Sequence, residues 1–163
     1  MKKLILIRHA KSSWQSNASS DFDRPLNDRG KADAPRMGEY LSALEFRPDQ
    51  FYTSSAVRAE ATAKLIAKEI GYDPELLIAD RRLYLADVPH LQSIMREFSD
   101  DWECVFLIGH NPTITDCANA LANDELENMP TCGVYGIELN IDSWRKLRNG
   151  AGSKLFFQAP KLL

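Results

Sequence analysis

The sequence predicts an α/β protein with a mostly parallel sheet. Short apolar runs of strand type alternate with helical patterns over most of the 163 residues, and such alternation is typical of βαβ units. The runs Leu4–Ile7 and Cys104–Ile108 are continuously apolar and partly β-branched, as in strands that are buried on both faces. Only a short segment, Trp144–Leu147, separates the last two runs. We expect these two to pair as an antiparallel extension at one edge of the sheet.

Six segments are expected to form strands. In chain order they are Leu4–Ile7, Phe51–Thr53, Leu76–Ala79, Cys104–Ile108, Val134–Leu139 and Lys154–Phe157. After the first strand comes a long segment, Lys11–Asp28, that is rich in Ser, Asn and Asp. A loop this long between a strand and a helix is often functional. Because it begins directly after Arg8 and His9, we expect it to form a wall of a site.

Four helices are predicted from apolar residues three or four positions apart. Asn27 is a candidate N-cap of the first helix, and Ser54 or Ser55 of the second. The second helix should end at Gly71, and Asp87 precedes the third. The expected buried faces are Ala34, Met37, Leu41 and Leu44; Ala59, Ala63, Ile66 and Ile70; Leu91, Ile94, Met95 and Phe98; and Ile114, Cys117, Ala118 and Leu121.

The composition restricts the kinds of protein that this chain can be. A length of 163 residues fits one domain, residues 1–163, and 44% hydrophobic and 26% charged residues are ordinary for a globular protein. The net charge of -3 leaves no broad basic surface for nucleic acid or an anionic membrane. The three cysteines form no C-x-x-C pair, and no segment is long enough for a signal peptide or a membrane helix. We expect a cytoplasmic protein that acts as a monomer.

Arginine and histidine side chains follow three of the expected strands. Arg8 and His9 follow the first strand, and His110 follows the fourth. Arg58 lies in the first turn of the helix after the second strand. Ligands of open α/β sheets bind beyond the carboxyl ends of the strands, so parallel strands would bring these four residues together. Arginines offer forked donors to phosphate oxygens, helix N-termini add N–H groups, and a neutral histidine can attack phosphorus.

Each of these residues taken alone also has a structural interpretation. A histidine at a strand end is more often a hydrogen-bonded structural residue than a catalyst, and a lone arginine is usually a surface group. Their joint placement at three junctions favours phosphoryl chemistry. Lys11 either adds positive charge beside this cluster or is a surface lysine, and His90 is expected to be a surface residue.

Other phosphatase chemistries fit the sequence poorly. A cysteine phosphatase needs an arginine six positions after its cysteine, and here those positions hold His110, Asn123 and Glu138. Segment Asp21–Asp23 has the two carboxylates of an aspartate nucleophile, but it lacks the final residue of that motif and the preceding strand. The sequence contains neither a Walker loop nor H-E-x-x-H, and three histidines are too few for a multi-histidine metal site.

Specific motifs occur in order along nearly the whole chain. They are Arg8-His9-Ala10-Lys11-Ser12, Asp23-Arg24-Pro25-Leu26 followed by Arg29-Gly30, Ser54–Ala59 with Thr62, Gly109-His110-Asn111-Pro112, and the closing segment Gly152–Lys161. Together they resemble the histidine phosphatase superfamily, which includes the phosphoglycerate mutases, and more specifically its small SixA-type phosphohistidine phosphatases. Ala10 stands where the superfamily signature has glycine, a replacement that the SixA-type branch tolerates.

The resemblance implies a fold and a set of roles. The fold would be a three-layer α/β/α sandwich. His9 would be the nucleophile and would be transiently phosphorylated, and no metal or other cofactor would be required. The phosphoryl group and the substrate would be held by Arg8, Arg58, His110, Lys11 and Ser12.

The leaving group gives a clue to the substrate. Mutases and broad phosphomonoesterases of this superfamily have a carboxylic general acid, and the candidate segment Arg82–Asp87 offers only Asp87, which is either a helix cap or a proton donor. An alkoxide leaving group needs such a proton, whereas histidine leaves readily because its conjugate acid has a pKa of about 6.5. We therefore predict a phosphohistidine phosphatase that acts on a phosphorelay or phosphotransfer protein.

Two other functions stay open at this point. The same chemistry could act on a small phosphate ester, with Asp87 as the acid. A non-catalytic phosphate-binding protein could retain the fold, although it would not need the nucleophile. A mutase is favoured least, because the chain is short for the segments that must enclose the substrate of a mutase.

Overall fold

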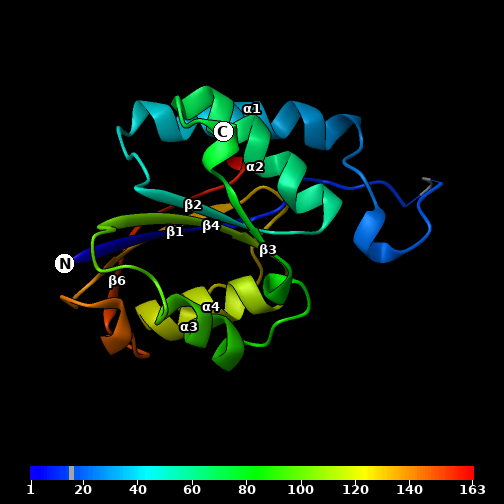
Figure 1. Ribbon diagram of the computed structural model, residues 1–163. Coiled ribbons are helices and arrows are strands. Elements are labelled where there is room, and N and C mark those ends of the chain that lie inside the picture. Colours follow the sequence, from blue (N-terminus) through cyan, green and yellow to red (C-terminus); the bar gives the residue numbers. More distant parts are fainter. Residues whose placement is uncertain (15–16) are drawn as a thin grey trace.

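The computed structural model describes residues 1–14 and 17–163, and within these ranges it contains a six-stranded sheet with helices on both faces (Figure 1). The strands are β1 (Lys2–Arg8), β2 (Gln50–Ser54), β3 (Ile78–Asp80), β4 (Cys104–Gly109), β5 (Val134–Leu139) and β6 (Gly152–Gln158). The α-helices are α1 (Asp28–Ala43), α2 (Val57–Ile70), α3 (Val88–Met95) and α4 (Thr113–Ala122).

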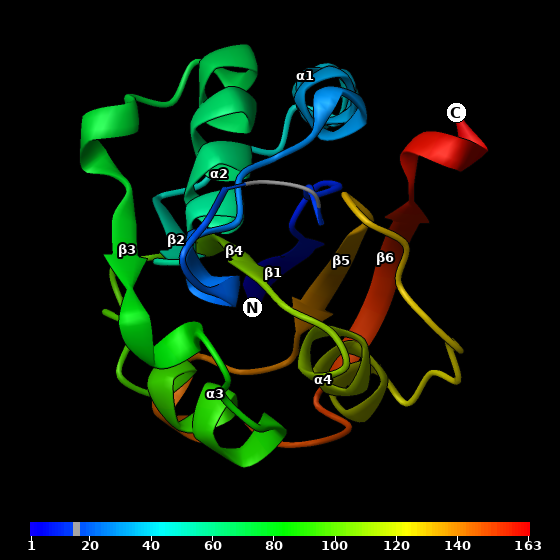
Figure 2. The same cartoon turned by 90° about the vertical axis from the view of Figure 1, so that its right-hand side faces the viewer.

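The strands lie in the order β3-β2-β4-β1-β5-β6. The first four are parallel to one another, whereas β5 is antiparallel to both β1 and β6. This confirms the mostly parallel sheet and its antiparallel extension. Arg8 lies opposite Gly109, and Thr53 lies opposite Ile108. The carboxyl ends of β1, β2 and β4 therefore share one edge of the sheet, which faces the viewer in Figure 2.

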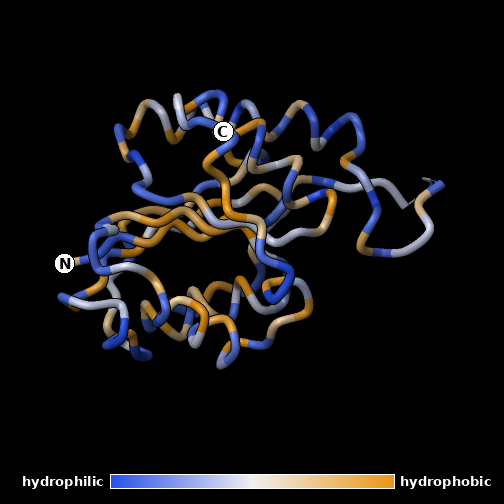
Figure 3. Tube along the Cα trace, in the orientation of Figure 1, coloured by the Kyte–Doolittle hydropathy of each residue, from blue (hydrophilic) through white to orange (hydrophobic). Residues whose placement is uncertain are grey.

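The sheet is the middle of three layers, because α1 and α2 cover one face and α3 and α4 cover the other (Figures 1 and 2). Alternate residues of β1 point to opposite faces. Ile5 and Ile7 pack into the core beneath α1 and α2, and Leu4 and Leu6 pack into the core against α3 and α4. All four side chains are buried, which explains the continuous apolar run. Figure 3 shows the hydrophobic strands between outer segments that are largely polar.

Most of the predicted helix ends are confirmed. The side chains of Asn27 and Asp87 each accept a hydrogen bond from a backbone N–H in the first turn of the helix that follows. Helix α2 ends at Gly71, which has a φ of 74°, as a helix C-terminus of this kind requires. The prediction that Ser54 or Ser55 caps α2 is wrong. Strand β2 continues through Ser54, and the N-cap position falls after Ser55.

Four apolar residues lie outside the elements predicted for them. The third strand begins at Ile78, after Leu76 and Leu77, because Pro74–Leu76 forms a 3-10 turn that Asp73 caps. Leu44 follows the last residue of α1 and is partly exposed, and Phe98 follows the end of α3 but is buried. None of the helices in the described ranges is both long and apolar enough to cross a membrane.

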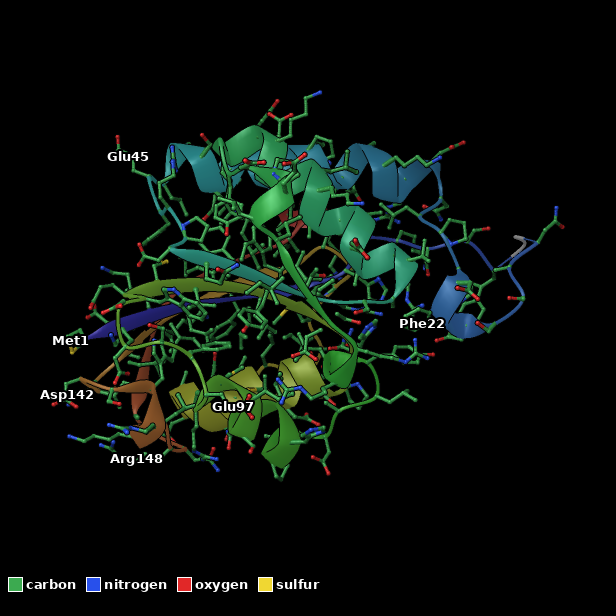
Figure 4. The ribbon with its side chains drawn as sticks, in the orientation of Figure 1. Met1, Phe22, Glu45, Glu97, Asp142 and Arg148 are labelled. Carbon is green, nitrogen blue, oxygen red and sulfur yellow. The ribbon has the colours of Figure 1, made fainter. Side chains whose placement is uncertain are left out.

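The loop predicted between residues 11 and 28 is present after β1. Residues 15 and 16 of this loop lie outside the described residues. In its described part, Ser12 pairs with Leu26 in an isolated β-bridge, and Asp21–Asp23 forms a 3-10 turn. Phe22, labelled in Figure 4, marks this turn, which projects at the carboxyl edge of the sheet.

Candidate active site

The structure brings Arg8, His9, Arg58 and His110 together at the carboxyl edge of the sheet. Arg8 is the last residue of β1, Arg58 lies in the first turn of α2, and His110 directly follows β4. Nε of Arg58 donates a hydrogen bond to Nε2 of His9 at 3.4 Å. The ring centroids of His9 and His110 are 5.1 Å apart. The predicted convergence of these four residues is therefore confirmed.

The hydrogen bonds of His9 determine which ring nitrogen is free to react. Nδ1 lies 2.8 Å from the backbone oxygen of Ala10, and a carbonyl oxygen only accepts, so Nδ1 carries the proton. The lone pair is then on Nε2, which faces Arg58. Burial, together with the nearby charges of His110, Arg58 and Arg8, lowers the pKa of His9 to about 3, although the hydrogen bond to Ala10 acts in the opposite direction. The ring is therefore neutral at pH 7 and Nε2 is a nucleophile.

His110 is held by Ser54, a residue that the sequence analysis considered only as a helix cap. Nε2 of His110 lies 2.8 Å from Oγ of Ser54 at the end of β2. Burial, followed by the charge of Arg58, lowers the pKa of His110 to about 4, so this ring is also neutral at pH 7. Its Nδ1 is buried and has no hydrogen-bond partner within the part of the chain that the structure describes. Ser54 thus orients His110 toward the cluster.

Thr62 ties the loop after β1 to helix α2. Its Oγ1 accepts a hydrogen bond from the backbone N–H of Ala10 and donates one to the backbone oxygen of Arg58. Arg8 is anchored separately, because its Nη1 donates to the backbone oxygen of Met129 at 3.0 Å. These contacts fix the backbone of Arg58 and the side chain of Arg8, and such preorganised donors are what an anion site needs.

Asp21 is a site residue that the sequence analysis missed in this role. Its backbone oxygen accepts a hydrogen bond from Nη1 of Arg58 at 2.7 Å, and its Oδ2 accepts from Nη2 at 3.1 Å. The hydroxyl of Tyr84 also donates to Oδ2, and Nε of Arg24 donates to Oδ1. The pKa of Asp21 falls to about 2, mainly because of the Tyr84 hydroxyl and then because of Arg24 and Arg58. Asp21 is therefore an anion at pH 7.

Two cavities meet at this cluster. The first, of about 200 Å³, is polar and contains Arg8, His9, Arg58 and His110 in its wall. The second, of about 320 Å³, is bounded by Asp21 and by a mainly apolar wall that includes Leu83, Tyr84, Leu85, Ala86, Leu91 and Pro112. Arg58 and His110 line both cavities. The first has the donors that a phosphoryl group needs, and the second offers space beside it for the group that carries the phosphoryl.

The remaining predicted residues occupy distinct places. Lys11 and Ser12 line the polar cavity, and Oγ of Ser12 accepts a hydrogen bond from Nη1 of Arg24. Asp87 lines neither cavity. Its Oδ1 accepts from the backbone N–H of His90 at 2.8 Å, which is the helix-cap alternative. His90 is exposed, as predicted.

Comparison with known proteins gives the family. The family model of the histidine phosphatase superfamily (branch 1) matches residues 4–84. A chloroplast protein of Arabidopsis thaliana whose function is uncharacterised is 28% identical over 153 residues, which cover 89% of this chain and 70% of that protein. A 2,3-bisphosphoglycerate-dependent phosphoglycerate mutase of Azorhizobium caulinodans is 33% identical over 96 residues, or 58% of this chain. The match spans only 47% of the length of that mutase.

Solved structures extend the similarity to the complete fold. The structure of SixA from Agrobacterium tumefaciens matches with a TM-score of 0.81 and 25% identity, and the match covers 98% of both chains. The protein histidine phosphatase SixA in complex with tungstate matches with a TM-score of 0.82 at 19% identity, over 98% of this chain and 97% of that one. With the family match and the arrangement of the four residues, these similarities establish that the chain belongs to the histidine phosphatase superfamily and is a phosphatase of the SixA type.

Proposed function

We propose that this phosphatase hydrolyses phosphohistidine on a protein, through a phosphoryl group held transiently on Nε2 of His9. The observation that carries the proposal is the neutral His9 ring, whose lone pair faces Arg58 inside a polar cavity. Nε2 attacks phosphorus, and the bond from phosphorus to the substrate nitrogen breaks. Arg8, Arg58 and His110 hold the phosphoryl oxygens. Water then attacks phospho-His9 and releases inorganic phosphate.

The groups around the site support phosphohistidine over a phosphate ester. An alkoxide leaving group needs a proton donor in the transition state. Asp87 caps a helix, Asp21 is an anion with a pKa of about 2, and His110 is neutral with a pKa of about 4. An imidazole leaves without such help, since its conjugate acid has a pKa of about 6.5. The proposed substrate is a phosphorelay or phosphotransfer protein in the cytoplasm.

The test is paired hydrolysis of a histidine-phosphorylated carrier protein and p-nitrophenyl phosphate, with EDTA present throughout. We expect rapid loss of phosphohistidine, slow cleavage of the ester, and loss of both activities in His9→Ala. The matched control is His90→Ala, which removes an exposed histidine outside the site and should retain full activity. Turnover of phosphohistidine by His9→Ala at the wild-type rate would refute the proposal.

A small phosphate ester is the second candidate substrate, because the cavity of about 320 Å³ beside the cluster has room for a small organic group. In that case Asp87 would have to leave its cap position and act as the acid. Asp87→Asn would then cripple ester hydrolysis while phosphohistidine cleavage continued. Equal ester rates in Asp87→Asn and the wild type would exclude Asp87 as the acid.

A further inference from the structure

The carboxylate of Asp21 retains capacity to accept one more hydrogen bond. A carboxylate offers about four acceptor positions. Nη2 of Arg58, the Tyr84 hydroxyl and Nε of Arg24 use three of them. The Asp21 side chain is 47% exposed and borders the cavity of about 320 Å³. Among the described residues it is therefore an anion with one acceptor position left, beside the cavity that we assign to the leaving group.

The surroundings of Asp21 suit a flat ring that carries an N–H group. Among the described residues that line this cavity, Asp21 alone has a carboxylate, and the rest of the wall is largely apolar. Tyr84 presents its ring to His110 at a centroid distance of 5.5 Å and its hydroxyl to Asp21. The guanidinium of Arg58 donates hydrogen bonds both to the Asp21 carboxylate and to Nε2 of His9. A ring whose one nitrogen is bound to phosphorus could thus present its other nitrogen to Asp21.

We infer that Asp21 accepts a hydrogen bond from the N–H of the substrate's phosphorylated imidazole and so holds that ring in its protonated form. This inference rests on the proposed function and assigns the leaving-group side of the same reaction. The protonated ring is the better leaving group, because the electron pair of the breaking P–N bond returns to a cationic ring. The products of the step are phospho-His9 and a neutral imidazole, which keeps its proton on the nitrogen that faces Asp21.

The proposed contact mirrors the one that the structure shows on His9. There, the Ala10 carbonyl holds the proton on Nδ1 while Nε2 faces the phosphoryl site. Asp21 would hold the corresponding proton on the substrate ring. It does not act as a general acid, because its pKa of about 2 keeps it ionised. The charged and titratable groups that face it are Arg58 on α2, Arg24 on its own loop, Tyr84, and His110 after β4.

The test compares Asp21→Asn with the matched control Asp23→Asn, whose carboxylate binds Ser19 and Ser20 instead of the site. Each is assayed with a histidine-phosphorylated carrier protein and with p-nitrophenyl phosphate, from about pH 5 to about pH 9, the range in which imidazole titrates.

We expect Asp21→Asn to lower kcat/KM for phosphohistidine about 10- to 100-fold at the upper end of this range, as the loss of a hydrogen bond to a charged group does. Its loss of activity with rising pH should begin about one pH unit lower. Ester cleavage by Asp21→Asn should fall much less than phosphohistidine cleavage and keep its pH profile, because an ester has no ring N–H for Asp21 to bind. Asp23→Asn should match the wild type with both substrates.

A purely positioning role for Asp21 predicts a different result. If Asp21 only orients Arg58, Asp21→Asn slows both substrates equally and leaves the pH profile in place, and the inference fails. Wild-type rates in Asp21→Asn would overturn it as well. Failure of the proposed function gives a different result from failure of the Asp21 inference. In that case the wild type would not cleave phosphohistidine, or His9→Ala would cleave it equally well.

Discussion

Two regions build this active site by different means. The scaffold group, which consists of Arg8, His9, Arg58 and His110, sits on strand ends and a helix start whose positions are fixed by the register of the sheet. The loop group, Asp21 and Arg24, is held mainly by hydrogen bonds between side chains. His9 and Arg58 are buried, whereas the Asp21 side chain is 47% exposed. The scaffold group is thus preformed, while the loop group is held by exposed contacts that a bound molecule can exchange.

Among variants that keep His9, the largest effect is expected from Arg58, because within the described part of the chain it bonds both to the scaffold group and to the loop group. Its Nε donates to His9 and both Nη atoms donate to Asp21. Arg58→Ala should lower kcat/KM about 10²–10³-fold, as the loss of a preorganised donor to the transition state does. Arg58→Lys should recover part of this loss, since lysine restores the charge but not the fork.

The matched control is Arg82→Ala, which removes an exposed arginine that pairs with Asp80 and Glu97 away from the site. Its steady-state rates should equal those of the wild type. If kcat/KM of Arg58→Ala stays within a few-fold of that of Arg82→Ala, then catalysis does not depend on the arginine that joins the scaffold group to the loop group.

The scaffold group could be predicted from the sequence because strand ends and helix starts leave local signals. An apolar run that ends in Arg8 and His9 locates both residues at the sheet edge, and the run before His110 does the same. The caps at Asn27 and Asp87 are equally local, since each side chain bonds to a backbone N–H three positions ahead.

The role of Asp21 and the contact between Ser54 and His110 could not be predicted, because both depend on residues far apart in the sequence. Asp21 reaches the site through Arg58 and Tyr84, which are 37 and 63 positions away. Ser54 precedes a helix in the sequence, which favours either Ser54 or Ser55 as the cap, but the Ser54 hydroxyl instead contacts His110, 56 positions away. No local pattern encodes either contact, because each depends on how β2, β4 and the long loop pack together.

The pH dependence of stability should separate the two groups. His9 has a pKa of about 3 in the folded protein and about 6.5 when unfolded. The unfolded chain therefore binds more protons below pH 6.5, so this histidine's contribution is present above pH 6.5 and is lost as the pH falls toward 3. His110, with a folded pKa of about 4, behaves in the same way. Asp21 has a folded pKa of about 2 and should lose its contribution only below its ordinary value of 3.8.

Urea unfolding at about pH 7 and about pH 5 measures this difference. We expect the free energy of unfolding to fall by about 1–2 kcal/mol per buried histidine between these values. His9→Gln should lose roughly half of that pH dependence, and Asp21→Asn should retain all of it. If the free energy of unfolding changes by the same amount between these two pH values in His9→Gln and in the wild type, then His9 is not held neutral in the folded protein.

The smallest expected effect concerns Asp87, which directly follows Ala86 in the wall of the cavity of about 320 Å³ but bonds to the backbone of α3. Asp87→Ala should lower the free energy of unfolding by about 1 kcal/mol, as the loss of an N-cap does, whereas Asp87→Asn should not, because asparagine caps equally well. Neither variant should change phosphohistidine turnover. Thermal unfolding and the carrier-protein assay, run on both variants, measure the two properties separately. If both variants lose turnover while Asp87→Asn keeps its stability, then Asp87 takes part in catalysis and is more than the N-cap of α3.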